Sequence, residues 1–426
     1  MFAFSDPSPL RHASRDSHPH PTYPWNKRIS DTMNKTVSNT KRTPAHIANR
    51  VTALQQRVQS WGCDALLVSN DPDVQYLTGF AAQDSWVIVL ADSNTPYILS
   101  DGRFKDQIPA QAPQATAVMR GKRDLHELLA DIVDQHALKK VAVQADYLRV
   151  TERKKIAQQI GSDRVLDVDD GLIQQRSVKD ATEIDSIRQA IAIQQQAFLR
   201  TREYIRPGMT EADIAGYLEH QTRILGADGM SFPTIVAVDA NAALPHYEPG
   251  LAQVREGGML LIDWGVRYQG YCSDMTRVLA VGKMPAKIRE IYDVVHQAYQ
   301  AGVEAIRPGA SQTAVDQAAR DVIEKAGFGE HFQHSLGHGI GLDIHEQPRL
   351  SFRQDGQLLA GQVVTVEPGI YLPGIGGVRL EDDVLVTADG AVVLCDLPLD
   401  AEWAVIEAGE GRVPAPHYEA RSVIQR

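Results

Sequence analysis

The 426-residue sequence contains only three cysteines, Cys63, Cys272 and Cys395, which are widely spaced and form no Cys-x-x-Cys pair. This spacing excludes a disulfide framework and fits a reducing, cytoplasmic compartment. Acidic residues outnumber basic residues, and the resulting net charge of −11 argues against nucleic-acid and anionic-membrane partners. No apolar run approaches the roughly 18 residues that a membrane span requires. We therefore expect an ordinary globular protein with no nucleic-acid or membrane partner.

The length exceeds the usual ceiling for a single hydrophobic core, so two domains are expected. Residues 1–45 are rich in Pro, Ser, His and basic side chains and show no apolar periodicity. We interpret them as a disordered tail, or as an over-long start with Met33 as the initiator. Residues 46–175 then alternate short apolar strands with amphipathic helices, which predicts an α/β domain. No phosphate-binding glycine loop follows these strands.

Residues 176–400 are predicted to form a second, α+β domain, followed by a C-terminal tail over 401–426. A long amphipathic helix, "SVKDATEIDSIRQAIAIQQQAFLRTREYI", opens this domain. The segments "IRPGMTEADIAGYLEHQTRILGA" and "IRPGASQTAVDQAARDVIEKAGF" then align without gaps. Thr210 and Ser311 occupy matching helix N-cap positions, and Gly226 and Gly327 matching C-terminal ones. We interpret the two segments as an internal duplication. The alternative is that they are alike only because this kind of loop-to-helix turn is common in proteins.

Two apolar runs around "VRYQGY" predict a β-hairpin that carries one aspartate in each strand, Asp263 and Asp274. A turn centred between Tyr268 and Gln269 would place these carboxylates directly opposite each other, with Cβ atoms about 5 Å apart. Facing carboxylates repel each other unless a cation or a shared proton lies between them. The alternative is that Asp263 starts a turn with Gly265 while Asp274 caps or is solvated.

A second predicted hairpin, "QVVTVEPGIYLPGIGGVRLEDDVLVT", repeats this arrangement with Glu367 and Glu381, whose midpoint is Gly374. Each half of the duplicated region thus supplies one hairpin and two acids. Four carboxylates that converge in a core require cations, and two divalent ions clamped by bridging carboxylates are the familiar solution in hydrolases. We therefore predict a shared metal site.

Candidate histidine ligands lie in "HFQHSLGHGIGLDIHEQP". His334 and His338 have the spacing of a helical zinc pair, but the surrounding glycines make a continuous helix improbable, and no His-Glu-x-x-His motif is present. Glycines on both sides of His338 allow its backbone to approach a metal closely. His345 reaches the same cleft in this interpretation, while His246 in "LPHYEP" is a weaker candidate.

Together, "DWGVRYQGYCSDMTR", "SLGHGIGLDIHE", "TVEPGIY" and "GVRLEDDVLV" resemble the metal-binding motifs of the pita-bread metallopeptidases, which include methionine aminopeptidase, aminopeptidase P and prolidase. The resemblance covers roughly residues 180–400. The segment "RVTALQQRVQSWGCDALLVSNDPDVQYLTGF" resembles the creatinase-type N-terminal domain of aminopeptidase P and prolidase, which methionine aminopeptidases lack. The resemblance implies a creatinase-like α/β domain followed by a pita-bread α+β domain with a pseudo-twofold repeat.

The resemblance also implies roles for individual residues. Asp263 would bind a first metal, Asp274 and Glu381 would bridge both metals, and His338 and Glu367 would bind the second. His246 and His345 match histidines that contact substrate and stabilise the tetrahedral intermediate. Glu367 is the candidate proton shuttle, and Arg379 is a candidate partner of either a ligand or the substrate carboxylate. The family's Gly-x-Asn loop reads "DAN" here, with Asp239 at the glycine position.

The implied activity is hydrolysis of the N-terminal Xaa-Pro bond of peptides by a dinuclear-metal aminopeptidase. The alternative is an Xaa-Pro dipeptidase (prolidase), and more distant alternatives are a metal-independent creatinase-like hydrolase and a non-catalytic binding module. Four carboxylates and one imidazole favour manganese, with cobalt or iron as alternatives. The family resemblance also leads us to expect a homo-oligomer.

Overall fold

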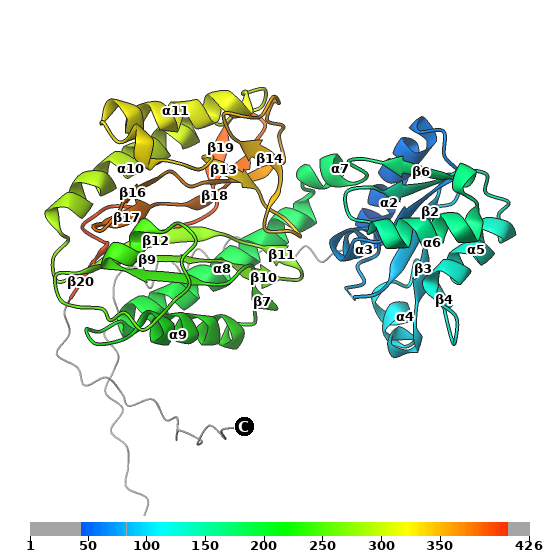
Figure 1. The fold of residues 1–426 in the computed structure, drawn as a ribbon, viewed down its shortest axis with the longest axis horizontal. Helices are drawn as coiled ribbons and strands as arrows, with labels where there is room; N and C mark the ends of the chain where they lie inside the picture. The colour runs from blue at the N-terminus through cyan, green and yellow to red at the C-terminus, as the bar shows by residue number, and fades with distance from the viewer. Residues whose placement is uncertain (1–43, 82, 408–426) are drawn as a thin grey trace, which may run out of the picture. The chain divides into compact units, whose positions relative to one another are not determined.

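The computed structural model describes residues 44–81 and 83–407 (Figure 1). The predicted N-terminal tail lies outside these residues except for its last two positions, and residues 408–426 of the predicted C-terminal tail also lie outside them. Among the helices of the described part, none is both long enough and apolar enough to cross a membrane.

The N-terminal region is built on a six-stranded mixed sheet of order β4-β3-β2-β1-β5-β6. β1 pairs antiparallel with β2 and parallel with β5. The strands are β1 (Ala65–Val68), β2 (Trp86–Leu90), β3 (Tyr97–Ser100), β4 (Thr116–Met119), β5 (Val141–Gln144) and β6 (Val165–Val168). The helices are α2 (Pro44–Ser60), α3 (Asp71–Thr78), α4 (Gln107–Gln111), α5 (Leu125–Gln135) and α6 (Val150–Ile160), with 3-10 turns η1 (Gly102–Phe104) and η2 (Ser162–Arg164).

Both faces of the central strand β1 are buried, which explains why it is apolar throughout rather than alternating. Ala65 and Leu67 share a core with Leu128 of α5 and Ile156 of α6. Successive side chains of a strand point to opposite faces, so the fully buried Leu66 lies on the other side of the sheet, where α2 contacts β1. The predicted α/β layer arrangement is confirmed.

The second region begins with α7 (Ile173–Ser177) and the long helix α8 (Ala181–Tyr204). Asp180 caps α8 in a capping box with Glu183, which fixes where the helix starts. In Figure 1, α9 (Glu211–Ile224) lies below the strands of this region and α11 (Gln312–Lys325) lies above them, while α8 contacts β10 and β11, and α10 (Ala286–Ala305) contacts α11. These helices bury the apolar faces of the sheets between them.

The internal duplication is visible in the structure. Helices α9 (Glu211–Ile224) and α11 (Gln312–Lys325) each contain 14 residues. Thr210 and Ser311 cap them by accepting a hydrogen bond from the third helical backbone N–H, and the same two residues form isolated β-bridges, to Gln253 and Gln357. Gly226 and Gly327 both adopt positive φ, 97° and 85°, which glycine accommodates without strain. The predicted pseudo-twofold repeat is therefore confirmed.

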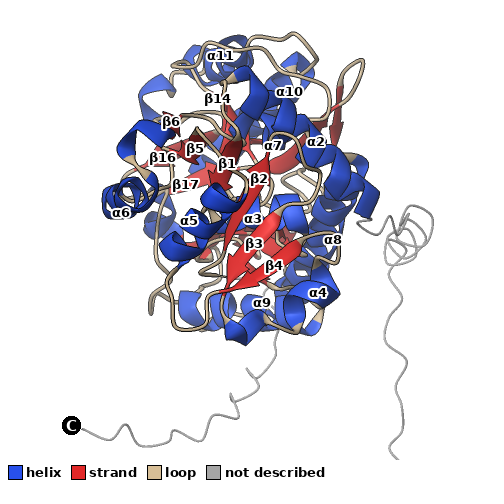
Figure 2. Ribbon diagram, turned by 90° about the vertical axis from the view of Figure 1, so that its right-hand side faces the viewer, coloured by secondary structure: helices blue, strands red, loops and turns tan. Residues whose placement is uncertain are grey.

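Two larger sheets carry the acidic hairpins, one of order β20-β12-β9-β8 and one of order β14-β13-β15-β18-β19, which Figure 2 colours red. All strands of the second region, including those outside the two larger sheets, are β7 (Gly229–Met230), β8 (Ile235–Val238), β9 (Met259–Trp264), β10 (Val266–Tyr268), β11 (Tyr271–Cys272), β12 (Met275–Val281), β13 (Gly337–Gly339), β14 (Glu346–Leu350), β15 (Val363–Val366), β16 (Gly369–Leu372), β17 (Gly376–Arg379), β18 (Asp382–Val386), β19 (Ala391–Val393) and β20 (Val405–Ile406). The 3-10 turns are η3 (Asp239–Ala243) and η4 (Gly329–His331). Because β20 pairs with β12, the ordered chain extends beyond the predicted boundary at residue 400.

The first acidic hairpin turns one residue later than predicted. Tyr268 pairs with Tyr271, so Gln269 and Gly270 form a two-residue turn, and both adopt positive φ, 50° and 83°. Such turns match the right-handed twist of the flanking strands. The expectation that Asp263 lies directly opposite Asp274 is therefore wrong: Asp263 pairs with Thr276. Because Asp274 lies two residues from Thr276, the two acids are diagonal neighbours on the same face of the hairpin.

The second acidic hairpin has the predicted register. Val366 pairs with Asp382 and Gly369 pairs with Arg379, which places Glu367 opposite Glu381. The turn is centred on Gly374, with φ 77°. The midpoint inferred from the sequence is therefore confirmed.

Glycine at position 337 is required by the close approach of two strands. A Cβ atom at Gly337 would overlap the carbonyl oxygen of Thr365 and lie 2.9 Å from its Oγ1. We expect Gly337→Ala to reduce the free energy of unfolding by roughly 3 kcal/mol or more, because backbone cannot move aside as a side chain can. Denaturant unfolding measures the change. The matched control is Gly216→Ala in α9, where nothing lies within 4 Å of the new Cβ. That control should be stabilised by about 0.5–1 kcal/mol, and equal losses in both variants would contradict the strand-approach explanation.

Candidate metal centre

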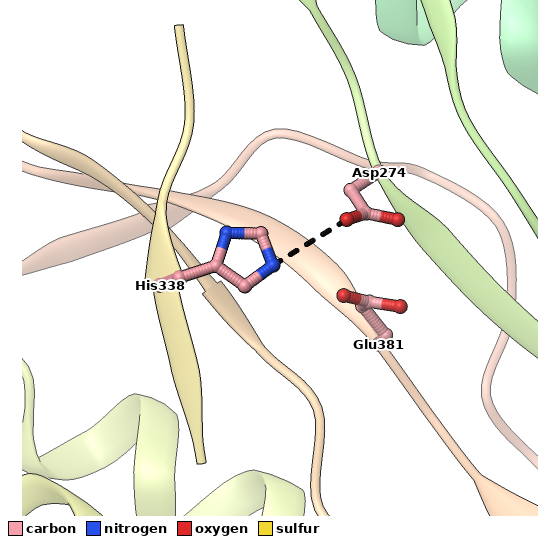
Figure 3. Close-up of side chains that lie close together, drawn as sticks. All are labelled: Asp274, His338 and Glu381. Atoms are coloured by element: carbon pink, nitrogen blue, oxygen red, sulfur yellow. Dashed lines mark ion pairs between the residues drawn. The ribbon is translucent and has the colours of Figure 1, made fainter. Parts of the chain in front are cut away.

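Three side chains from three separate segments meet in the interior of the second region. Asp274 precedes β12, His338 lies in β13, and Glu381 lies between β17 and β18. Each offers a ligand atom, and these atoms all lie within 4.8 Å of one another (Figure 3). The residues are 5%, 5% and 2% exposed. The structure thus brings together three of the five residues that the sequence predicts as metal ligands.

The other two predicted ligands border this group. His338 Nε2 lies 3.5 Å from Glu367 Oε1 and 3.6 Å from Asp274 Oδ2. Asp263, at the end of β9, has its Oδ1 buried without a hydrogen-bond partner in the described part of the chain. An unpartnered buried carboxylate oxygen is costly, so it is an open coordination position. The donor set of carboxylate oxygens and one imidazole nitrogen fits divalent cations.

Burial and mutual repulsion raise the pKa values of the carboxyl groups in this site. Burial raises the pKa of Asp274 well above its usual value, and repulsion from Glu381 and Asp263 raises it further. Burial and repulsion from Glu367 and Asp263 do the same to the pKa of Glu381. Burial also raises the pKa of Glu367 to about 8, although the nearby Arg379 lowers it. A cation between the carboxylates would relieve this repulsion.

His338 is held in the form that binds metals. Burial, with a further contribution from His345, lowers the pKa of His338 to about 3, so its imidazole is neutral near pH 7. Its Nδ1 lies 3.1 Å from the carbonyl oxygen of Gly339 and donates to it, which directs the lone pair of Nε2 toward Asp274 and Glu367. Its backbone N–H donates to Thr365 Oγ1 at 3.1 Å.

Arg379, the predicted partner of a ligand or of the substrate carboxylate, donates hydrogen bonds to three side chains of the protein. Its Nη2 donates to Asp263 Oδ2 at 2.5 Å, its Nε to Thr276 Oγ1 at 3.0 Å and its Nη1 to the Tyr371 hydroxyl at 2.7 Å. Thr276 in turn donates to Glu381 Oε2 at 2.6 Å. With a side chain only 4% exposed, Arg379 is placed to orient Asp263, and this geometry favours that role over contact with substrate.

The two predicted substrate histidines are exposed and adjacent to the acids. His246 lies in the loop after η3, and it is close enough to affect the pKa of both Asp263 and His345. The His345 ring contacts the His338 ring, with centroids 4.4 Å apart and an interplanar angle of 78°. Asp239, at the family's glycine position, adopts φ 50° and accepts hydrogen bonds from Arg255 Nε and the Met259 backbone N–H, at 2.7 and 3.0 Å. These contacts hold a left-handed conformation that glycine adopts freely.

Arg349 is a site residue that the sequence analysis missed. It pairs with His338 across β13 and β14, and its charge affects the pKa of His338, His345 and Glu367. Within residues 44–81 and 83–407 its guanidinium forms no hydrogen bond or close ion pair, although the charge of Glu367 attracts it, and it borders a pocket of about 130 Å³ together with His345. The available signal was its spacing of four residues after His345.

Comparison with known proteins agrees with this architecture. The model of metallopeptidase family M24 matches residues 185–388, and that of the creatinase/prolidase N-terminal domain matches residues 50–178. The putative dipeptidase YkvY of Bacillus subtilis is 35% identical over 359 residues, which are 81% of this chain and 98% of that protein.

Two solved structures are similar along most of their length. The Xaa-Pro dipeptidase from Bacillus anthracis is 34% identical with a TM-score of 0.80, covering 85% of this chain and 99% of that one. The X-Pro aminopeptidase from Thermotoga maritima is 35% identical with a TM-score of 0.77, covering 82% and 99%. The buried carboxylates, the histidine between them and these matches lead to one conclusion: the chain is a peptidase that belongs to metallopeptidase family M24 and carries a creatinase/prolidase-type N-terminal domain.

Proposed function

We propose that this protein is a two-metal peptidase that hydrolyses the N-terminal Xaa-Pro bond of peptides. The observation that carries the proposal is the convergence of Asp274, His338 and Glu381, bordered by Asp263 and Glu367, in one buried site. Five donor side chains are more than a single ion would bind if one of its coordination positions stays open for the substrate. The proline preference is supported by the Xaa-Pro peptidases among the similar structures.

The proposed chemistry assigns a task to each residue around the metals. Divalent ions, when bound, supply a water molecule of lowered pKa and polarise the scissile carbonyl. Glu367 would receive the proton of the attacking water and pass it to the leaving nitrogen, because its carboxylate borders the donor group, with Oε1 3.5 Å from His338 Nε2. His246 and His345 donate hydrogen bonds to the oxygen that becomes negatively charged in the transition state. Arg379 holds Asp263 in place.

A second candidate function, an Xaa-Pro dipeptidase, is favoured by Arg349. A guanidinium without a partner beside the catalytic histidines is suited to bind a carboxylate in bidentate fashion. A dipeptide presents its C-terminal carboxylate close to the scissile bond, whereas a longer peptide presents an uncharged amide there. Arg349 therefore supports selection for dipeptides.

One assay tests these proposals together. The protein is stripped with a chelator, reloaded with manganese, and assayed with Ala-Pro, Ala-Pro-Ala and Ala-Ala. Hydrolysis of both proline peptides supports the aminopeptidase, and hydrolysis of Ala-Pro alone supports the dipeptidase. No hydrolysis of any peptide would overturn the peptidase proposal, and full activity after metal removal would overturn the two-metal site.

Replacing Arg349 with methionine should separate the two substrate classes. We expect KM for Ala-Pro to rise by about 10- to 100-fold, since a charged hydrogen-bonded pair contributes about 1.5–3 kcal/mol, while KM for Ala-Pro-Ala changes little. Steady-state kinetics on both peptides measures the ratio. Arg353→Met, four residues further along the chain and outside the 130 Å³ pocket, is the control and should change neither value. Equal increases for both peptides would contradict carboxylate recognition by Arg349.

We also propose manganese as the metal, because oxygen donors predominate among the candidate ligands. The three cysteines are buried and unpaired, which supports a cytoplasmic location. The homo-oligomer stays an expectation from the family resemblance.

A further inference from the structure

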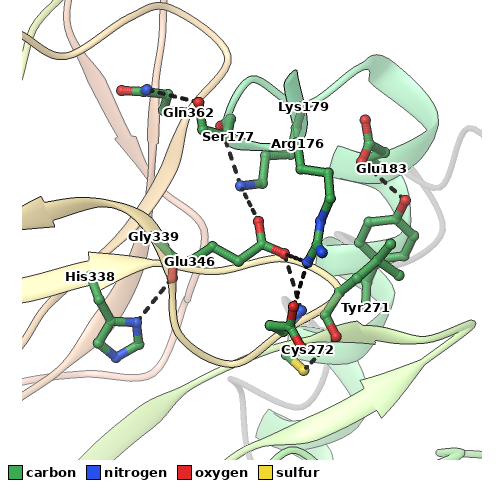
Figure 4. A network of polar contacts seen from close by, with 12 residues as sticks. Arg176, Ser177, Lys179, Glu183, Tyr271, Cys272, His338, Gly339, Glu346 and Gln362 are labelled. Carbon is green, nitrogen blue, oxygen red and sulfur yellow. Dashed lines mark hydrogen bonds and ion pairs between the residues drawn. The ribbon is translucent and has the colours of Figure 1, made fainter. Parts of the chain in front are cut away.

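A buried cluster of charged side chains lies beside the metal centre without belonging to it (Figure 4). Arg176 lies in the last turn of α7, Lys179 precedes α8, and Glu346 begins β14. We call these three residues the Glu346 cluster. Their side chains are 4%, 0% and 7% exposed. Charges so deeply buried are tolerated only when they are paired and hydrogen-bonded, so their arrangement is specified closely.

The Glu346 carboxylate is the centre of this cluster. Its Oε1 accepts hydrogen bonds from Arg176 Nη2 and, at 3.0 Å, from the backbone N–H of Asp343. Its Oε2 accepts from Lys179 Nζ at 3.1 Å. Arg176 also pairs with Asp73 and Asp343, both at 2.8 Å. The attraction of Lys179 and Arg176 outweighs burial and lowers the pKa of Glu346 to about 2, so its negative charge persists at neutral pH.

The carboxylate is folded back onto the turn formed by residues 341–346. A Cβ atom at Gly341 would lie 2.6 Å from Glu346 Oε2, so only glycine allows this close approach. The carbonyl oxygen of Gly341 accepts a hydrogen bond from the backbone N–H of Cys272 at 2.7 Å. Cys272 lies two residues before Asp274 in the first acidic hairpin. The turn is therefore held at one end by the metal-centre hairpin and at the other by the Glu346 cluster.

His345 depends on this turn for its position. It is exposed, and its ring forms no hydrogen bond to any residue that the structure describes. Its ring contact with His338 cannot fix it alone, because an edge-to-face contact of this kind contributes about 0.5–1.5 kcal/mol. The backbone of the 341–346 turn must therefore place His345, and Glu346 is the next residue in the chain.

We propose that Arg176, Lys179 and Glu346 are positioning residues, which hold the 341–346 turn so that the His345 imidazole stays above the metal centre. The role of His345 in this inference rests on the proposed function. The three side chains act through the backbone between Gly341 and Glu346, and their charges pair with one another and with Asp73 and Asp343. Arg176 and Lys179 lie at the start of the second region, so this segment positions a residue that is far away in the sequence.

A double-mutant cycle with Glu346→Ala and His345→Ala tests the coupling. We expect kcat/KM for Ala-Pro to fall by about 100-fold in each single variant, the cost of a misplaced catalytic group, mainly through kcat. The double variant should fall no further than His345→Ala, and all variants should retain the wild-type metal content. If the losses in kcat/KM of the two single variants multiply in the double variant, the two residues act independently and the proposal is overturned. Glu346→Gln, which keeps the acceptor for the Asp343 N–H, should recover part of the activity, and it replaces Glu346→Ala in the cycle if that variant does not fold.

Hydrogen exchange of the backbone amides of residues 341–347 provides a readout that needs no activity. Both Glu346 variants should exchange faster in this turn than the wild type, and unchanged exchange would overturn the proposal. The matched control is Arg50→Met, whose side chain is 4% exposed and pairs with Asp180 at 2.7 Å, outside the turn. It should lower the melting temperature without changing exchange at 341–347 or kcat. If the wild type hydrolyses no peptide, the proposed function fails, while the exchange measurement still decides the positioning role.

Discussion

Asp274→Ala is expected to remove both metal ions and to reduce peptide hydrolysis by about 10⁴-fold or more, since water has no lowered pKa without them. Asp274 lies 3.6 Å from His338 and within 4.8 Å of Glu381, so it belongs to the part of the site where two ions would share ligands. Removing a bridging carboxylate weakens both positions at once. Metal content by mass spectrometry and hydrolysis of Ala-Pro, after reloading with manganese, measure the two effects.

Two comparisons make this result specific. Asp263→Ala should keep one ion per chain, because Asp263 is assigned to one metal only and Arg379 already occupies its Oδ2. Asp101→Ala removes a carboxylate of similar burial from the N-terminal region, where it pairs with Arg103, and should keep both ions. Two ions still bound to the Asp274 variant would exclude its role as a bridge.

The sequence predicts which acidic and histidine side chains come together better than it predicts the strand register that brings them together. The second hairpin has its densest cluster of turn-forming residues around Gly374, at equal distances from Glu367 and Glu381, and the strands pair with that midpoint. In the first hairpin, Gln269 is in the left-handed conformation, which its residue type does not signal. A shift of one residue in the turn moves the partner of Asp263 by two residues. Asp274 stays on the same face of the hairpin as Asp263, so the two acids still lie close together although the turn was predicted one residue too early.

Residues that act through tertiary contacts could not be found from sequence patterns. Glu346 ends the motif "SLGHGIGLDIHE", but its partners Arg176 and Lys179 are about 170 residues earlier in the chain, so the motif does not reveal its role. The spacing of Arg349 from His345 marks its position, but it does not show that the guanidinium forms no hydrogen bond or ion pair in the described part of the fold. The repeat, by contrast, was readable because caps and glycines that act locally recur at equal spacing in both copies.

Removing the metals is expected to make the stability of the protein decrease as the pH rises from about 5 to 8. Glu367 has a pKa of about 8 in the folded state, against an ordinary value of 4.5. The folded chain therefore binds more protons than the unfolded chain between these values, so the contribution to stability is complete below pH 4.5 and is lost as the pH approaches 8. Each pKa unit corresponds to about 1.4 kcal/mol, so Glu367 alone contributes roughly 5 kcal/mol as an upper bound.

Denaturant unfolding at pH 5.5 and 8, with a chelator and separately with manganese, measures this difference. In the chelated protein the free energy of unfolding should be several kcal/mol lower at pH 8, because Asp274 and Glu381 have pKa values raised in the same direction. Glu367→Gln should reduce the dependence, since its amide does not titrate. A chelated protein equally stable at both pH values would contradict mutual repulsion among these carboxylates.

The same reasoning explains why manganese should abolish the pH dependence. A bound cation stabilises the ionised carboxylates and so displaces the protons that the metal-free site retains at neutral pH. Metal binding to the folded state alone also adds about 4 kcal/mol at a concentration 1,000 times its Kd. The four buried acids are therefore unfavourable in the metal-free fold at pH 8 and favourable once metal is bound. Their presence in two core hairpins is understandable only if folding and metal binding are coupled.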